Sequence, residues 1–239
     1  MATDKSTQQG PVVLEPGVMP CYRNAWQQLW KYPLEIFLIF IIFIIITMPG
    51  SFSNFSVSVD KWIDPLALIF LALFGTVLGI FGTIYSILVS GPVNYGFSYA
   101  YLRAARGELP EVKDVFEGFK TYWNVVLASL IVNIIVVIGF ILLVVPGIVF
   151  ACKLAFVPFL VIDRKMEAVA AVRESWQMTN GYAPDVFYIG LLGIPILIAG
   201  AICLGVGIIV SCMWISLAIA SLYHAVSLKK QTSQQSPMQ

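Results

Sequence analysis

Charge is the scarcest property of this 239-residue chain. Charged residues make up 11% of it and hydrophobic residues 59%, whereas an average soluble domain carries roughly 25% charged residues. A water-soluble protein of this size could not bury so much apolar surface in one core, so lipid must be the solvent for much of it. The net charge of +1 gives no electrostatic support for a nucleic-acid partner.

Residues that build catalytic and metal centres are equally scarce. The chain has one histidine, His224, and four cysteines that form no C-x-x-C pair. A metal-assisted hydrolase needs several ligands together, and covalent catalysis needs a nucleophile, a base and an orienting group. Ser221 precedes His224 by one helical turn, but this pair has no third group. We therefore expect no catalytic residue, no metal, no cofactor and no enzymatic activity.

The two ends of the chain are polar. Residues 1–20 contain no apolar run, which argues against a cleavable signal peptide. Gly, Pro, Gln and Ser are common in this segment and in residues 229–239. We expect both to be flexible tails on either side of a single transmembrane domain, residues 21–228.

Long apolar runs fill the rest of the chain and predict an all-α, polytopic bundle of six transmembrane helices. A span needs about 20 mostly apolar residues. We expect the second span to end at Gly91-Pro92, the third to turn into the fourth at Pro146-Gly147, and the fifth to turn into the sixth at Gly205 and Gly207. The predicted spans are 34–48, 65–90, 124–145, 148–162, 186–204 and 207–228.

Basic residues predict the orientation, because Lys and Arg are retained in the cytoplasm. The loops assigned to the outside carry only Lys61, and Lys153 lies inside a span. All other basic residues fall in the tails and in the loops of the opposite side. The sequence therefore predicts a multi-pass protein with both termini in the cytoplasm.

A short amphipathic stretch precedes each odd-numbered span. The three stretches are Tyr22–Lys31, Glu111–Lys120 and Glu167–Gln177, and each places apolar side chains four residues apart on one helical face. They predict three interfacial helices on the cytoplasmic side and a threefold repeat of helix plus hairpin. The alternative is that any loop re-entering a membrane tends to be amphipathic. Four tryptophans are expected to anchor the membrane interface: Trp26, Trp30, Trp123 and Trp176.

Several motifs in the middle of the chain are similar to motifs of known membrane-protein families. They are R-G-E-x-P at Arg106–Pro110, D-x-F-x-x-F at Asp114–Phe119, the Pro146-Gly147 pair, and A-x-x-x-S-W-x-x-x-x-G at Ala171–Gly181. Together, over residues 91–223, they resemble uncharacterised bacterial six-helix membrane proteins of domain-of-unknown-function families. They are also similar to the membrane domain fused to some glycerophosphoryl diester phosphodiesterases. The resemblance implies the six-helix fold and a bacterial inner (cytoplasmic) membrane, and it implies no activity.

Two polar residues within spans are candidates for a site. Lys153 lies about 9 Å beyond Pro146-Gly147 at 1.5 Å per residue, and an ionisable residue inside a span is by default a functional hypothesis. It would reach Asn133 or Asp64 and neutralise a buried carboxylate or a lipid phosphate. The alternatives are snorkelling of the lysine to the outer headgroups and, for Asn133, a structural hydrogen bond between helices.

Two functions are compatible with these features. The sequence favours a non-catalytic membrane scaffold or accessory subunit, with membrane lipids and a membrane-protein partner or a second copy as its partners. The alternative is a small-molecule or lipid transporter, or a lipid-handling protein, with a groove near Lys153. A polar cavity would favour the second function, and a flat apolar outer surface would favour the first.

Overall fold

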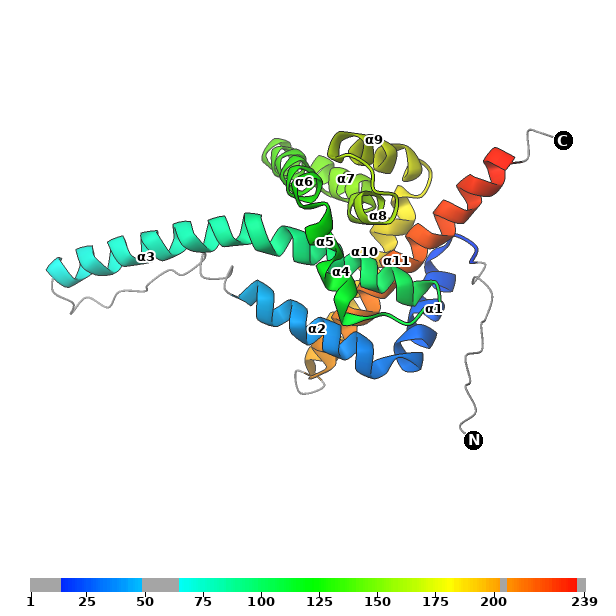
Figure 1. Ribbon diagram of the computed structural model, residues 1–239, viewed down its shortest axis with the longest axis horizontal. Helices are drawn as coiled ribbons and strands as arrows, with labels where there is room; N and C mark the ends of the chain where they lie inside the picture. The colour runs from blue at the N-terminus through cyan, green and yellow to red at the C-terminus, as the bar shows by residue number, and fades with distance from the viewer. Residues whose placement is uncertain (1–13, 49–64, 203–205, 236–239) are drawn as a thin grey trace.

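The computed structural model describes residues 14–48, 65–202 and 206–235, and these fold into helices without any strand (Figure 1). The all-α prediction is confirmed. The elements in chain order are α1 Val18–Lys31, α2 Pro33–Thr47, α3 Pro65–Tyr85, the π-helical turn η2 Ser86–Ser90, α4 Gly91–Ala105, the 3-10 turn η3 Val112–Phe116, α5 Glu117–Lys120, α6 Tyr122–Leu142, α7 Val144–Leu154, α8 Val157–Asp163, α9 Ala168–Met178, α10 Ala183–Ile202 and α11 Val206–Gln235.

Five helical stretches in the described part of the chain are long and apolar enough to cross a membrane, and the bent pair α1–α2 would be a sixth. This agrees with the predicted six-span architecture. The five stretches are Ile69–Ala105, Tyr122–Leu142, Val144–Asp163, Ala183–Ile202 and Gly207–Thr232.

The first two helices meet at a corner of 96°. Tyr32, the residue before Pro33, leaves the helical conformation with φ −128° and ψ 56°, as the proline ring requires of its neighbour. Pro33 then begins α2, since its missing N–H is not needed in a first turn. α1 buries one face, including Cys21, Ala25 and Leu29, against α11. It is therefore the first of the predicted amphipathic helices.

The second predicted span does not end at Gly91-Pro92. Pro92 cannot donate a hydrogen bond to the carbonyl of Leu88, and its ring crowds that carbonyl. The π-helical turn η2 lies directly before this pair and widens the helix where the misfit arises. α3, η2 and α4 therefore form one continuous helix instead of ending at the proline (Figure 1).

α3 projects from the other helices as a long arm (Figure 1). Its contacts are mainly with η2, and apolar side chains are exposed on all of its faces. A helix that is apolar all round is stable in lipid or against another apolar surface. The most exposed of these side chains are Leu66, Ile69, Phe70, Leu73, Phe74 and Phe81.

η3 and α5, the second predicted amphipathic stretch, pack along α4 through two glycines. A Cβ on Gly96 would overlap the backbone carbonyl of Val115, and a Cβ on Gly118 would overlap that of Pro92. Only glycine lets the two backbones approach so closely. The segment is therefore fixed against α4 along its whole length and does not lie apart as an isolated interfacial helix.

The third and fourth predicted spans meet at Leu143, not at Pro146-Gly147. Leu143 is extended, with φ −170° and ψ 153°, and the proline and glycine lie in the first turn of α7, where a missing N–H is tolerated. Gly139 allows the close approach, because its Cβ would lie 2.9 Å from the Cα of Gly147. The span predicted at 148–162 is thus Val144–Asp163, interrupted between α7 and α8 before Pro158.

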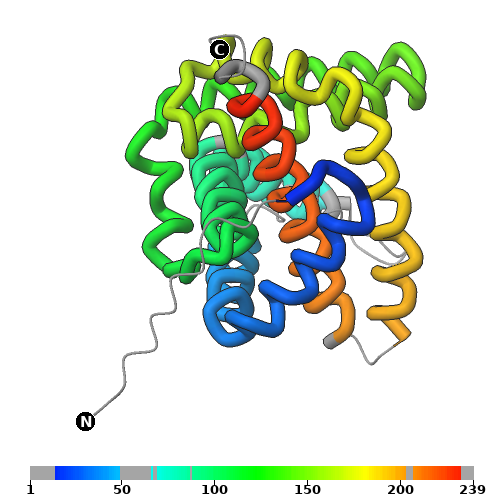
Figure 2. The backbone as a smooth tube through the Cα atoms, turned by 90° about the vertical axis from the view of Figure 1, so that its right-hand side faces the viewer, coloured from blue at the N-terminus to red at the C-terminus, as the bar shows by residue number. Residues whose placement is uncertain are grey.

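α10 and α11 form a second long hairpin and lie side by side (Figure 2). Gly200 and Gly207 face each other so closely that a Cβ on either would meet the other's backbone. Gly207 lies inside α11, and Gly205, the other predicted turn residue, lies outside the described residues.

The predicted tails are more helical than expected. α1 begins at Val18, and α11 continues to Gln235, although residues 229–239 were predicted to be flexible. The Nζ of Lys230 donates a 2.6 Å hydrogen bond to Glu174 on α9, which holds this end of α11 against the bundle. Residues 1–13 and 236–239 lie outside the described residues.

The element order recurs three times, as the sequence indicates. α1 precedes α2 and α3, η3 and α5 precede α6 and α7, and α9 precedes α10 and α11. Superposition of the three units stays a prediction, and so does the assignment of the amphipathic helices to the cytoplasmic side.

Candidate functional site

A groove of about 420 Å³ lies between η2 and α4, α6, and the junction of α7 with α8. This volume falls within the roughly 300–1,000 Å³ typical of small-molecule sites. Most of its apolar lining comes from α6 and from the α7–α8 junction. Its polar lining residues are Ser86, Ser90, Asn94, Tyr95, Ser129 and Asn133.

Two of the three walls are irregular at the groove. The π-helical turn η2 supplies Ser86 and Ser90, and the break between α7 and α8 supplies Ala155 and Pro158. Pro158 cannot bond the carbonyl of Leu154, which also lines the groove. π-helical turns are frequent at functional sites, and interrupted helices build the binding sites of many transporters.

The polar side chains of the groove are largely unpartnered. Within the described part of the chain, the side chains of Ser86, Ser90, Asn94 and Asn133 form no hydrogen bond with protein, and the two asparagines are exposed residues that line the groove. The hydroxyl of Ser129 donates to a carbonyl of its own helix at 2.9 Å, so its oxygen can still accept. A polar group that faces an apolar solvent without a partner is costly, so this groove requires water or a polar ligand.

Another asparagine shows the contrast. The amide of Asn24 on α1 is buried and donates to the Ala105 carbonyl at 3.1 Å and to the Ser221 hydroxyl at 3.0 Å. It joins three helices, which is the structural role that polar residues commonly play between helices. Ser221 itself donates to the Leu217 carbonyl at 2.8 Å. Ser221 and His224 are both buried in the packed interior, and the Ser221 hydroxyl is used in structural hydrogen bonds.

Lys153 does not line this groove, so the expected approach to Asn133 is not formed. α7 presents Ala151 and Leu154 to the groove, and the helical period places Lys153 on a different face. The other expected partner, Asp64, lies outside the described residues. The structure therefore places Asn133 in the candidate site and separates Lys153 from it.

α9 holds Lys153 instead. The ammonium lies 4.7 Å from the centroid of the Trp176 ring, a cation–π contact. The backbone carbonyl of Lys153 accepts hydrogen bonds from the hydroxyls of Ser175 at 2.8 Å and Thr179 at 3.1 Å. These contacts tie the end of α7 to α9. They are structural contacts, and a carboxylate or phosphate partner for Lys153 stays a hypothesis.

The expected interfacial anchors are largely exposed. Trp26 packs against Trp30 and Trp214, with ring centroids 5.8 Å and 4.8 Å away, while Trp123 is 74% exposed. Trp176 is partly covered by Lys153. Exposed tryptophans suit an interfacial position, and their anchoring role stays a prediction.

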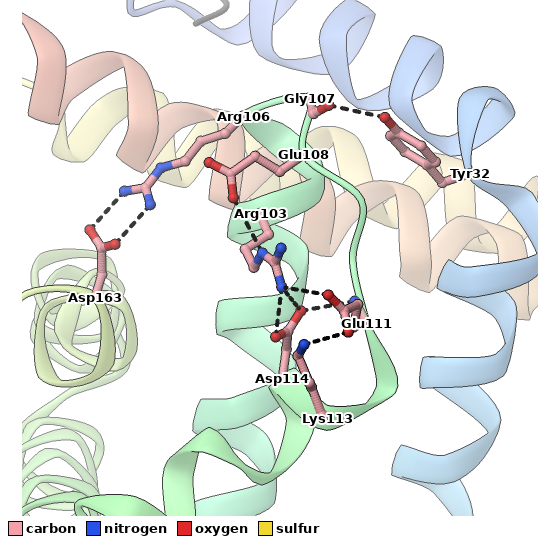
Figure 3. Close-up of polar contacts among 9 residues, drawn as sticks. All are labelled: Tyr32, Arg103, Arg106, Gly107, Glu108, Glu111, Lys113, Asp114 and Asp163. Carbon is pink, nitrogen blue, oxygen red and sulfur yellow. Dashed lines mark hydrogen bonds and ion pairs between the residues drawn. The ribbon is translucent and has the colours of Figure 1, made fainter. Parts of the chain in front are cut away.

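An ionic network fixes the loop that follows α4 (Figure 3). Arg103 donates two hydrogen bonds to Asp114, at 2.9 and 2.8 Å. Arg106 donates two to Asp163 at the end of α8, at 2.8 and 2.7 Å, and Tyr223 on α11 donates to the same carboxylate at 3.3 Å. Burial acts to lower the pKa of Arg106, but its hydrogen bonds to Asp163 and the charge of that carboxylate raise the pKa overall. Each arginine is paired with at least one carboxylate, so the network fixes the loop against the bundle and leaves neither arginine without a counter-charge.

Comparison with known proteins does not assign the chain to a family. No family model, curated protein or solved structure matches the chain. The resemblance to bacterial six-helix membrane families therefore stays an expectation from the motifs. No group of three His, Cys, Asp or Glu residues that could hold a metal ion occurs among the described residues.

Sequence reasoning found one groove residue, Asn133, and missed the others. A signal was present, since polar residues recur every fourth position at Ser86, Ser90 and Asn94, and again at Ser129 and Asn133. Such spacing places them on one face of a helix. The predicted helix end at Gly91-Pro92 divided the first stripe and concealed it.

Proposed function

We propose that this protein binds a small polar molecule, or the polar headgroup of a lipid, in the groove between η2–α4, α6 and the α7–α8 junction. It would act in transport or handling of that ligand, in a bacterial inner membrane and with both termini in the cytoplasm. One observation carries the proposal: Ser86, Ser90, Asn94 and Asn133 converge on one groove without hydrogen-bond partners in the described protein.

The lack of partners distinguishes this cluster from structural polar contacts. Asn24 shows what a structural asparagine does in this fold, because its amide is consumed by two hydrogen bonds between helices. An unmade hydrogen bond in an apolar environment costs about 1–3 kcal/mol. Several such groups in one groove therefore favour an occupant that satisfies them together.

The chemistry of the groove supports binding and not a reaction. Among the described residues, the lining holds hydroxyls, amides and one phenol, with no carboxylate, amine, imidazole or thiol. Covalent or acid–base catalysis needs a nucleophile matched to a base. A proton-coupled carrier usually also needs buried ionisable groups. The proposal is therefore a non-catalytic binding or transfer role.

Native mass spectrometry of the gently extracted protein tests the proposal. We expect the wild-type chain to retain a ligand that Asn133→Leu loses by roughly three- to tenfold, the effect of one net hydrogen bond. The matched control is Asn180→Leu, which removes an exposed amide outside the groove. Equal retention by all three proteins would contradict binding in the groove.

A second function, a membrane scaffold or accessory subunit, is favoured by the α3 arm. Apolar side chains are exposed from Ile69 to Ile84, and a partner or a second copy in the same membrane would have a long surface to contact. In the experiment above, a stoichiometric membrane protein in place of a small ligand would support this second function.

A further inference from the structure

We infer that the ligand of the groove is the uncharged, hydroxyl-bearing headgroup of a membrane lipid. This inference rests on the proposed binding role of the groove and assigns the class of ligand. It follows from three features: the charge of the lining, its mixture of polar and apolar side chains, and the position of the groove along the spans that line it.

The lining selects against a charged headgroup. Amides and hydroxyls each donate and accept hydrogen bonds, which is also what a hydroxyl-rich ligand does. A phosphate would bring a negative charge into an environment of low dielectric constant, which is strongly unfavourable without a cation. Lys153 lies over Trp176, and Arg103 and Arg106 are paired with Asp114 and Asp163. None of these cations belongs to the lining of the groove.

The groove is amphipathic as well as uncharged. η2 and α4 contribute the polar stripe of Ser86, Ser90 and Asn94, whereas α6 and α7 also contribute apolar side chains such as Leu130 and Leu154. The groove is open rather than enclosed, since Asn94 and Leu130 are both exposed. A molecule with a polar end and an apolar end matches both kinds of wall at once.

The groove lies near the middle of the spans that line it. Asn133 is 11 residues from Tyr122 and 9 from Leu142, the two ends of α6, or about 14–17 Å from either end at 1.5 Å per residue. Leu154 is similarly central in the stretch Val144–Asp163. The groove therefore lies within the hydrocarbon, where an uncharged headgroup costs less to bury than a charged one.

Lipid competition in nanodiscs tests the inference. The full chain is placed in phosphatidylcholine discs that contain equal amounts of monoglucosyl diacylglycerol and phosphatidic acid with the same acyl chains. Retained lipids are counted by native mass spectrometry. We expect the glucosyl lipid to be preferred, and Asn94→Leu and Asn133→Leu each to weaken its retention roughly three- to tenfold. Asn180→Leu is the control, and the melting temperature of each variant verifies that it is folded.

The outcomes separate the ligand class from the proposed function. Preference for phosphatidic acid that the same two variants abolish would overturn the uncharged headgroup and leave the groove as a binding site. Retention of free methyl glucoside as strongly as of the glucosyl lipid would overturn the lipid as source. Retention of neither lipid nor of methyl glucoside, in a folded wild-type protein, would overturn the proposed function together with this inference.

Discussion

Replacing Gly96 by alanine probes the packing of α4 on η3 and α5. The new Cβ would overlap the backbone carbonyl of Val115, which cannot rotate away as a side chain can. Alanine favours a helix over glycine by up to about 1 kcal/mol. Overpacking costs about 1–3 kcal/mol, and a collision with backbone belongs at the upper end of this range. We therefore expect Gly96→Ala to lower the free energy of unfolding by about 2 kcal/mol.

Gly75→Ala is the matched control, because Gly75 lies in the same continuous helix and its Cβ would have nothing within 4 Å. Thermal unfolding in detergent, followed by size exclusion of heated samples, measures both variants. A loss of 2 kcal/mol corresponds to a fall in Tm of roughly 4–8 °C for a chain of this size, whereas Gly75→Ala should leave Tm unchanged or raise it slightly. Equal Tm values for the two variants would refute the backbone contact between Gly96 and Val115.

Two further substitutions test the contacts that surround the site. Arg106→Gln leaves the carboxylate of Asp163 without its bidentate partner. Since both side chains are partly exposed, we expect the free energy of unfolding, followed by thermal unfolding, to fall by about 1–3 kcal/mol. Adding Asp163→Asn should restore part of this loss. Lys153→Met removes the cation–π contact with Trp176 but keeps the length of the side chain, so we expect a loss of about 0.5–2 kcal/mol and unchanged ligand retention. A double-mutant cycle with Trp176→Leu should show coupling between the two positions, and additive effects would exclude their contact.

Much of the helical framework follows from the distribution of apolar residues. Each apolar run is a helix in the structure, and each predicted amphipathic stretch is helical at least in part. Length and composition suffice for this, because a run of about 20 apolar residues has few alternatives to a spanning helix. The helix ends were predicted less well. A proline or glycine in the sequence predicts a helix end, whereas Pro92 lies within a continuous helix and Pro146 lies in a first turn.

Tertiary contacts explain these misplaced ends. The π-helical turn before Pro92 absorbs the misfit of its ring, and α4 continues because η3 and α5 cover it through Gly96 and Gly118. α11 continues because Lys230 reaches Glu174 on α9. Such contacts join residues far apart in the chain, and a local pattern carries no information about which of them will meet.

The candidate site was predictable in part for the same reason. Asn133 is recognisable from sequence as a polar residue in an apolar run. The spacing of four residues between Ser86, Ser90 and Asn94 is recognisable as well. That these stripes face each other across one groove depends on the packing of α4, α6 and α7. Charge is rare in a span, which makes Lys153 a candidate from sequence, but Leu154, the next residue, faces the groove while Lys153 faces Trp176 on α9.

η2 connects the two candidate functions. It supplies Ser86 and Ser90 to the groove, and it joins the α3 arm to α4. A ligand that hydrogen-bonds these serines therefore contacts the segment that sets the direction of the arm relative to α4. A ligand shifts a conformational equilibrium by its difference in affinity for the two states. If a partner binds only one orientation of α3 relative to α4, a ligand in the groove that favours the same orientation would therefore strengthen binding of that partner. Lipid binding and scaffolding would then be two properties of one helix, and not competing explanations of it.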